Sequence, residues 1–113
     1  MHGNPDHHDA ELLLRLYDLR REEKLRRARA WFVGEFQAQT LEEDQRKHPP
    51  GSEESAYTRM TLSYWDMAAS IVNYGLIHEQ FFFENCGELS FPTPVVNRLA
   101  SPPLRDAIQR SPA

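Results

Sequence analysis

The sequence predicts an all-α protein, a compact bundle of three to four helices followed by a proline-rich tail. Two segments, Ala10 to Trp31 and Glu53 to Asn73, place apolar residues three or four positions apart, as amphipathic helices do. No segment alternates apolar and polar residues over the length of a strand. The 113 residues suffice for one domain at roughly 100 to 200 residues per domain.

The amino end is polar, and residues 1–8 are predicted to be a flexible lead into a cytoplasmic protein, since no basic region precedes an apolar one. Asp9 is placed to cap a first helix that runs from Ala10 to Trp31 or beyond. The centre of this helix is highly charged, so it is expected to project partly into solvent or to lie against a partner. The segment Gln37 to Ser55, with an acidic run and Pro49-Pro50-Gly51, indicates a loop.

The second helix, Glu53 to Asn73, contains neither Gly nor Pro, follows Ser52 and ends before Gly75, which supplies a left-handed cap. It carries apolar residues on two sides, which predicts a central position in the bundle. One stripe comprises Tyr57, Met60, Tyr64, Met67, Ile71 and Tyr74, and the other comprises Thr61, Trp65, Ala68 and Val72.

A short third helix is expected over Leu76 to Glu84, which completes a helical domain at residues 9–89. The tail, residues 90–113, holds most of the prolines and cannot form one long helix. A last helical turn or two is expected to start at Ser101, with Pro102 at the favoured first position, and to continue through Leu104 and Ile108.

Composition excludes several classes of protein. The net charge of -4 argues against a surface that follows nucleic acid throughout, and a single cysteine, Cys86, excludes an intrachain disulfide and a multi-thiolate zinc site. The uncharged stretch Met67 to His78 is too short to span a bilayer. The histidines lack metal-ligand spacing, and no phosphate-binding, dinucleotide-binding or nucleophile-elbow motif occurs. No metal, cofactor or catalytic residue is therefore predicted, and the balance favours a protein that is not an enzyme.

A basic patch lies on the first helix, where seven Lys or Arg stand against three acids between Arg15 and Arg29. It could contact phosphates, but aromatic residues that would stack on bases are absent. A solvated helix laced with pairs such as Glu22 with Arg26 and Glu23 with Arg27 is the favoured interpretation. Conversely, the segment from Met60 to Asn97 carries acids and no basic residue, so the two segments could attract each other within one chain or between chains. The candidate patch is Arg20, Arg21, Lys24, Arg26, Arg27 and Arg29.

Consecutive aromatic residues provide a candidate interface. Phe81, Phe82 and Phe83 on a helix span about 200° of arc, so one of them must point away from a single core. Another part of the chain or a partner must cover it, and Trp31 and Phe36 raise the same question. A second candidate site is a small-molecule pocket lined by Tyr57, Tyr64, Trp65 and Tyr74, with Asp66 or Asn73 as polar anchors.

The motifs YWDMAASIVNYGLI (64–77), EQFF (79–82), NCGEL (85–89) and ELLLRLYDLRRE (11–22) resemble a group of small uncharacterised bacterial helical proteins, a domain of unknown function. The resemblance implies a bacterial all-helical domain and no activity. We therefore expect a non-enzymatic protein–protein interaction module or homo-oligomer. One alternative is a small-molecule-binding protein or enzyme that uses the tyrosine-lined pocket. A second alternative is weak nucleic-acid binding through the first helix.

Overall fold

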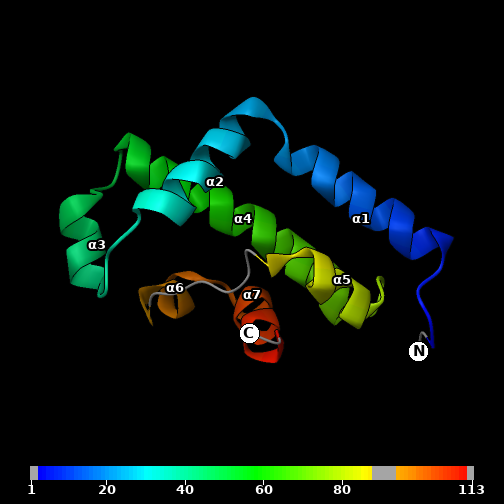
Figure 1. Cartoon of the computed structure of the whole chain (residues 1–113). Helices are drawn as coiled ribbons and strands as arrows, with labels where there is room; N and C mark the ends of the chain where they lie inside the picture. Colours follow the sequence, from blue (N-terminus) through cyan, green and yellow to red (C-terminus); the bar gives the residue numbers. More distant parts are fainter. Residues whose placement is uncertain (1–2, 88–93, 112–113) are drawn as a thin grey trace.

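The computed structural model describes residues 3–87 and 94–111, and these form helices and no strand (Figure 1). The all-α class is confirmed. The described residues contain more helices than the three to four expected, because the predicted first helix is divided and because the predicted loop and tail also hold helices. The helices are α1 (His7–Arg20), α2 (Glu23–Glu35), α3 (Leu41–Lys47), α4 (Glu53–Asn73), α5 (Glu79–Asn85), α6 (Pro94–Leu99) and α7 (Pro102–Arg110).

Helix α4 is the axis of the molecule and has the predicted bounds. The Ser52 hydroxyl accepts a hydrogen bond from the backbone N–H of Ser55 at 3.1 Å, and Gly75 takes a left-handed φ of 74° after the helix ends. Helices α2 and α7 make the largest contacts with α4, and α5 packs on it less extensively. Figure 1 shows α1 and α2 as an arch on one side of α4 and α7 on the other, with α5 drawn across the carboxyl-terminal part of α4.

Only one of the two apolar sides of α4 is fully covered. Trp65, Ala68 and Val72 are almost completely buried, as expected of a central helix. Met67 and Tyr74, by contrast, expose 42% and 82% of their surface. A central position thus does not bury both stripes, because the other helices leave Met67 and Tyr74 in contact with solvent.

The predicted first helix is two helices, α1 and α2, separated at Arg21 and Glu22. Arg21 keeps nearly helical backbone angles (φ -83°, ψ -9°), whereas Glu22 has ψ 140° and accepts a hydrogen bond from the N–H of Leu25 at 2.9 Å. The change of direction brings Leu16 of α1 and Phe32 of α2 into one core with α4. Burial of both halves thus outweighs the local preference for one continuous helix.

Helix α1 begins at His7 and is capped by Asp6, not by Asp9. The Asp6 carboxylate accepts from the Asp9 N–H at 3.1 Å, and the Asp9 carboxylate accepts from the Asp6 N–H at 2.9 Å. These reciprocal bonds form a capping box. The last two residues of the predicted flexible lead, His7 and His8, are consequently helical.

The predicted loop before α4 contains α3. The Thr40 hydroxyl accepts from the Glu43 N–H at 3.0 Å, and Glu43 pairs with Lys47 at 2.9 Å. The acidic run that suggested a loop occupies the first turn of α3, where negative charge favours a helix.

Helix α7 confirms the prediction of a short helix with Pro102 at its start. Leu104 and Ala107 are completely buried, and the Asn73 amide donates to the Pro103 carbonyl at 2.9 Å. Helix α6 was not predicted, and Val96 within it is also buried. The described part of the tail therefore contributes to the core.

The molecule is elongated along α4, with extents of 46 × 28 × 19 Å and a radius of gyration of 14.5 Å. A compact chain of this length has a radius of gyration of about 13 Å. No helix in the described part of the chain is long and apolar enough to cross a membrane. The length of α4 and the spread arch of α1 and α2 leave much of each helix near the surface.

Candidate interaction surfaces

The candidate interface residues lie mostly inside the chain. Phe82 is completely buried, and Phe36 and Phe83 expose 8% and 9% of their surface. Trp31 and Phe81 are half-buried. The chain itself therefore covers Phe36, Phe82 and Phe83, which leaves these three residues unavailable for a partner in the described conformation.

The aromatic residues at the end of α2 hold α3 in place. The His48 ring lies between Trp31 and Phe36, with ring centroids 5.0 and 5.5 Å away, and the His48 Nδ1 is 2.9 Å from a carboxylate oxygen of Asp44. Tyr57 of α4 joins the cluster at 6.1 Å from Trp31. Burial and the nearby Glu53 carboxylate raise the pKa of the Tyr57 phenol above its usual range. The part played by His48 in this cluster was not predicted, because His48 precedes two prolines in a segment that was expected to be a loop.

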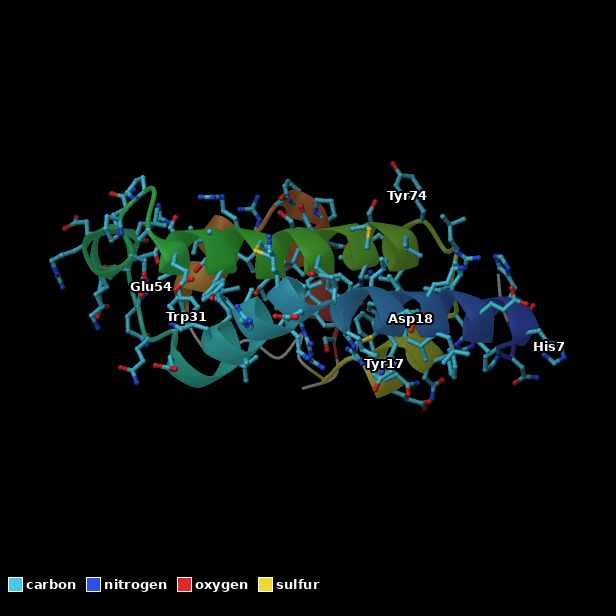
Figure 2. All side chains as sticks on the ribbon, turned by 90° about the horizontal axis from the view of Figure 1, so that it is seen from above. His7, Tyr17, Asp18, Trp31, Glu54 and Tyr74 are labelled. Atoms are coloured by element: carbon cyan, nitrogen blue, oxygen red, sulfur yellow. The ribbon has the colours of Figure 1, made fainter. Side chains whose placement is uncertain are left out.

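The six candidate pocket residues do not face one cavity. Tyr64 and Trp65 are buried in the core, and the Tyr64 hydroxyl donates to the Leu16 carbonyl at 2.5 Å. Tyr57 contacts Trp31 near the other end of α4, whereas Tyr74 points into solvent (Figure 2). Adjacent residues such as Tyr64 and Trp65 point about 100° apart, and Tyr57 lies about two turns before Tyr64, so the six side chains are spread around and along the helix.

The two polar anchors of the predicted pocket form hydrogen bonds with residues 101–110 of the tail. The Asp66 carboxylate accepts from the Ser101 hydroxyl, and Asn73 bonds to Pro103 and to the Arg110 guanidinium. A shallow depression beside them is lined by Ser70, Asn73, Tyr74 and Pro103 and is open to solvent. These contacts attach α7 to α4.

The basic patch lies at the corner between α1 and α2, and several of its members are engaged. Arg27 pairs with Glu23 at 2.6 Å, as predicted. The Arg20 and Arg21 guanidiniums lie over the Tyr17 ring at 5.1 and 5.7 Å from its centroid.

The other members of the patch differ in their exposure and contacts. Arg29 donates to the Arg20 carbonyl at 3.3 Å, whereas Lys24 and Arg26 are exposed. The predicted pair of Glu22 with Arg26 gives way to the cap of α2, where hydrogen bonds from the Leu25 and Lys24 backbone hold the pKa of the Glu22 carboxyl below its usual range. Most members of the patch are therefore solvated, and Tyr17 is the aromatic ring beside them.

One buried carboxylate links α1 to α5. Asp9 is completely buried, and one of its oxygens accepts from the backbone N–H of His78 at 2.7 Å. The imidazole of His78 in turn accepts from the Phe81 N–H at 3.2 Å and caps α5. The Asp-x-x-Asp spacing of Asp6 and Asp9 is the sequence signal for the capping box, but no local pattern indicates the bond to His78. Among the described residues, no group of three or more His, Cys, Asp or Glu could hold a metal ion.

Exposed apolar residues of the described chain lie on three helices. On α4 they are Met67 and Tyr74, with Leu76 just beyond the helix; on α1 they are Leu14, Tyr17 and Leu19; and on α2 there is Val33. Figure 2 shows Tyr17 and Tyr74 projecting in opposite directions. The α1 surface is interrupted by charged neighbours, whereas the α4 surface is not.

Comparison with known proteins supports an uncharacterised family and no specific activity. No curated protein and no solved structure matches the chain. The family model described as "Domain of unknown function (DUF4760)" matches residues 5–91, which include α1 to α5 and the motifs that suggested a resemblance. The chain therefore belongs to the DUF4760 family.

Proposed function

We propose that the protein is a non-enzymatic interaction module that self-associates through the exposed side of α4. The observation that carries the proposal is an uncharged surface on this helix, which we call the α4 strip. At about 100° per residue its members fall within an arc of about 100° along about 21 Å of helix. They are Met60, Ser63, Met67, Ser70, Ile71 and Tyr74.

The α4 strip is suited to burial against another apolar surface. Exposed apolar residues that form a continuous surface are typical of interaction sites, whereas isolated ones are not. The one acid of this part of the helix, Asp66, lies to the side of the strip and is bonded to Ser101. No desolvated charge would therefore oppose the burial of the strip.

A second copy of the chain is the partner that the strip fits. If two α4 helices cross antiparallel with Met67 at the two-fold axis, Tyr74 lies opposite the partner's Met60, and the small Ser63 and Ser70 allow the helices to approach closely. Arg59, at the amino-terminal end of the strip, then lies near the carboxyl end of the partner's α4, where the helix dipole is negative. The strip is thus complementary to itself in shape and in charge.

A cytoplasmic location is part of this proposal. The single cysteine, Cys86, is buried at 3% exposure, so it contributes to the packing of the core. This use of cysteine suits a reducing compartment, where structural disulfides are rare.

The test is the mass in solution, by light scattering at low and high salt over a wide range of concentration. We expect a dimer that resists salt, since its interface is apolar, and we expect Met67→Glu to weaken it at least about tenfold, because two carboxylates would meet at the axis. Leu14→Glu places the same charge at another exposed apolar residue, on α1, and should leave the dimer intact. A wild-type monomer at every concentration, or a Met67→Glu dimer of unchanged affinity, would overturn the proposal.

A further inference from the structure

Helix α1 is held to the rest of the chain by few buried groups. Of its fourteen residues, Asp9 and Leu16 are buried, and Leu12 and Leu13 are partly buried. The bond from His78 to Asp9 and the bond from Tyr64 to the Leu16 carbonyl attach it to α5 and α4. The opposite side of α1 is already exposed to solvent. Separation of α1 from the core would therefore newly expose only its inner side and the parts of α4 and α5 that this side covers.

The break between α1 and α2 rests on one backbone angle. Arg21 is near the helical region, and Glu22 has a helical φ of -56° but a ψ of 140°. Rotation of that ψ to about -42° would join α1 and α2 into one helix of about 29 residues, roughly 44 Å long. The same rotation would swing α1 away from α4 and α5.

The sequence around the break favours the joined helix. Neither Gly nor Pro occurs between Asp6 and Gly34, and the segment 20–27 consists of residues with high helix propensity. The carboxylate of Glu22, which now caps α2, would become free to pair with Arg26 one turn later. Local preference therefore opposes the break, and the packing of α1 on the core maintains it.

We propose that α1 exchanges between two copies of the chain, with each joined α1–α2 helix placing its α1 on the α4 and α5 surface of the other copy. In the exchanged dimer, Asp9 of one chain accepts from the His78 N–H of the partner subunit, and the Leu16 carbonyl accepts from the partner's Tyr64. The bonds of Asp9 and Leu16 are recreated between the chains, while the cap at Glu22 and the bond from Arg29 to the Arg20 carbonyl at the break are replaced by helical hydrogen bonds. Exchange is therefore a low-cost route to a dimer. The second copy is the fitting occupant because it presents the same surface that α1 already covers.

The exchange goes beyond the self-association proposed above, because it uses the inner side of α1 and not the α4 strip. Exchange re-forms the buried contacts of Asp9 and Leu16, whereas Met67 and Tyr74 of the strip are exposed, so the two modes of association do not compete for one surface. The two proposals also have separate tests, since Met67→Glu should leave exchange intact.

The test uses proline at residue 23, the first position of α2. There proline fits the broken form, because Glu22 before it is already extended and the first helical position needs no N–H donor. In the joined helix the same proline would clash with the preceding turn and remove a hydrogen bond, which costs about a hundredfold in each of the two joined helices. Glu23→Pro should therefore lower the association constant of the exchanged dimer about ten-thousandfold. Glu23→Ala removes the same carboxylate and its pair with Arg27 but permits the joined helix, and is the matched control.

Spin labels at Glu11 and Ala30, both on exposed or half-exposed helix positions, report the angle between α1 and α2, with the buried Cys86 left in place. The label positions are about 28 Å apart along a continuous helix and closer when it is bent. We expect the Met67→Glu protein, refolded at high concentration, to give a dimer with the longer separation. Adding Glu23→Pro should abolish this dimer, whereas adding Glu23→Ala should preserve it. Adding Glu22→Ala, which removes the cap of α2, should increase the fraction of this dimer several-fold.

Two results would overturn the exchange. One is a Met67→Glu protein that stays monomeric on refolding even with Glu22→Ala added. The other is a dimer whose labels keep the shorter separation and whose affinity is the same in Glu23→Pro and Glu23→Ala.

Discussion

Replacement of Asp9 by alanine tests the link between α1 and α5 directly. The Asp9 carboxylate is completely buried and accepts from the His78 N–H at 2.7 Å and from the Asp6 N–H at 2.9 Å. The partly buried N–H of His78 would lose a charge-assisted bond, at a cost of about 2 kcal/mol. Loss of the capping box at Asp6 adds about 1 kcal/mol. We therefore expect Asp9→Ala to lower the free energy of unfolding by about 3 kcal/mol.

The assay is urea unfolding followed by far-UV circular dichroism, with the change read from the midpoint at constant slope. Asp6→Ala is the matched control, because it removes the exposed partner of the capping box and leaves the bond to His78, and it should cost about 1 kcal/mol. Asp9→Asn, which keeps one acceptor oxygen, should fall between the two. Equal effects of Asp9→Ala and Asp6→Ala would refute the reasoning, since the bond across to α5 would then contribute nothing.

Three further outcomes are expected from single contacts. Tyr64→Phe keeps the buried ring but loses the hydroxyl bond to the Leu16 carbonyl, and urea unfolding should show a loss of about 1 kcal/mol. Gly75→Ala should cost a similar amount, about 1 kcal/mol, because φ is 74° there, although no atom lies within 4 Å of the added Cβ. The pKa of Glu22 is lowered in the folded chain by hydrogen bonds from the α2 backbone, chiefly from Leu25, so its capping bond is present above the unfolded pKa and is lost as the pH falls through the folded one. The protection of the amides at the start of α2 against hydrogen exchange, relative to an unfolded chain at the same pH, should therefore fall as Glu22 is protonated in the wild type and not in Glu22→Gln.

Helix α4 could be predicted to the residue because its signals are local. Ser52 at the start, the absence of Gly and Pro within the helix, and Gly75 after its end each act within one turn of the chain. The start of α7 at Pro102 was predictable for the same reason. Such signals depend on neighbours in sequence, which a single sequence displays completely.

The break at Glu22 could not be predicted, because every local signal around it favours a helix. What produces the break is the burial of Leu16 and Phe32 in one core, and this depends on where α4 lies relative to both. The same limit applies to Phe82: helical spacing shows that the three phenylalanines face different directions, but not that the chain itself covers this one. The hydrogen bond from His78 to Asp9 joins residues that are 69 positions apart, and no pattern in the sequence around either residue indicates it.

The α4 strip could be predicted only in part. The sequence shows that its residues are uncharged and share one side of the helix, but it does not show that this side is exposed. Apolar residues on two sides of one helix predict burial of both sides only if enough chain exists to cover them. A chain of this length buries roughly two thirds of its unfolded surface, and here α2 and α7 are the main cover of the side that holds Trp65. Met67 and Tyr74 are left without cover from the described chain, at an energetic cost that a second copy could remove. If the strip were merely tolerated, polar substitutions such as Met67→Gln should leave the mass in solution unchanged; if it is an interface, the same substitution should shift the protein toward monomer while the free energy of unfolding of the isolated monomer stays the same.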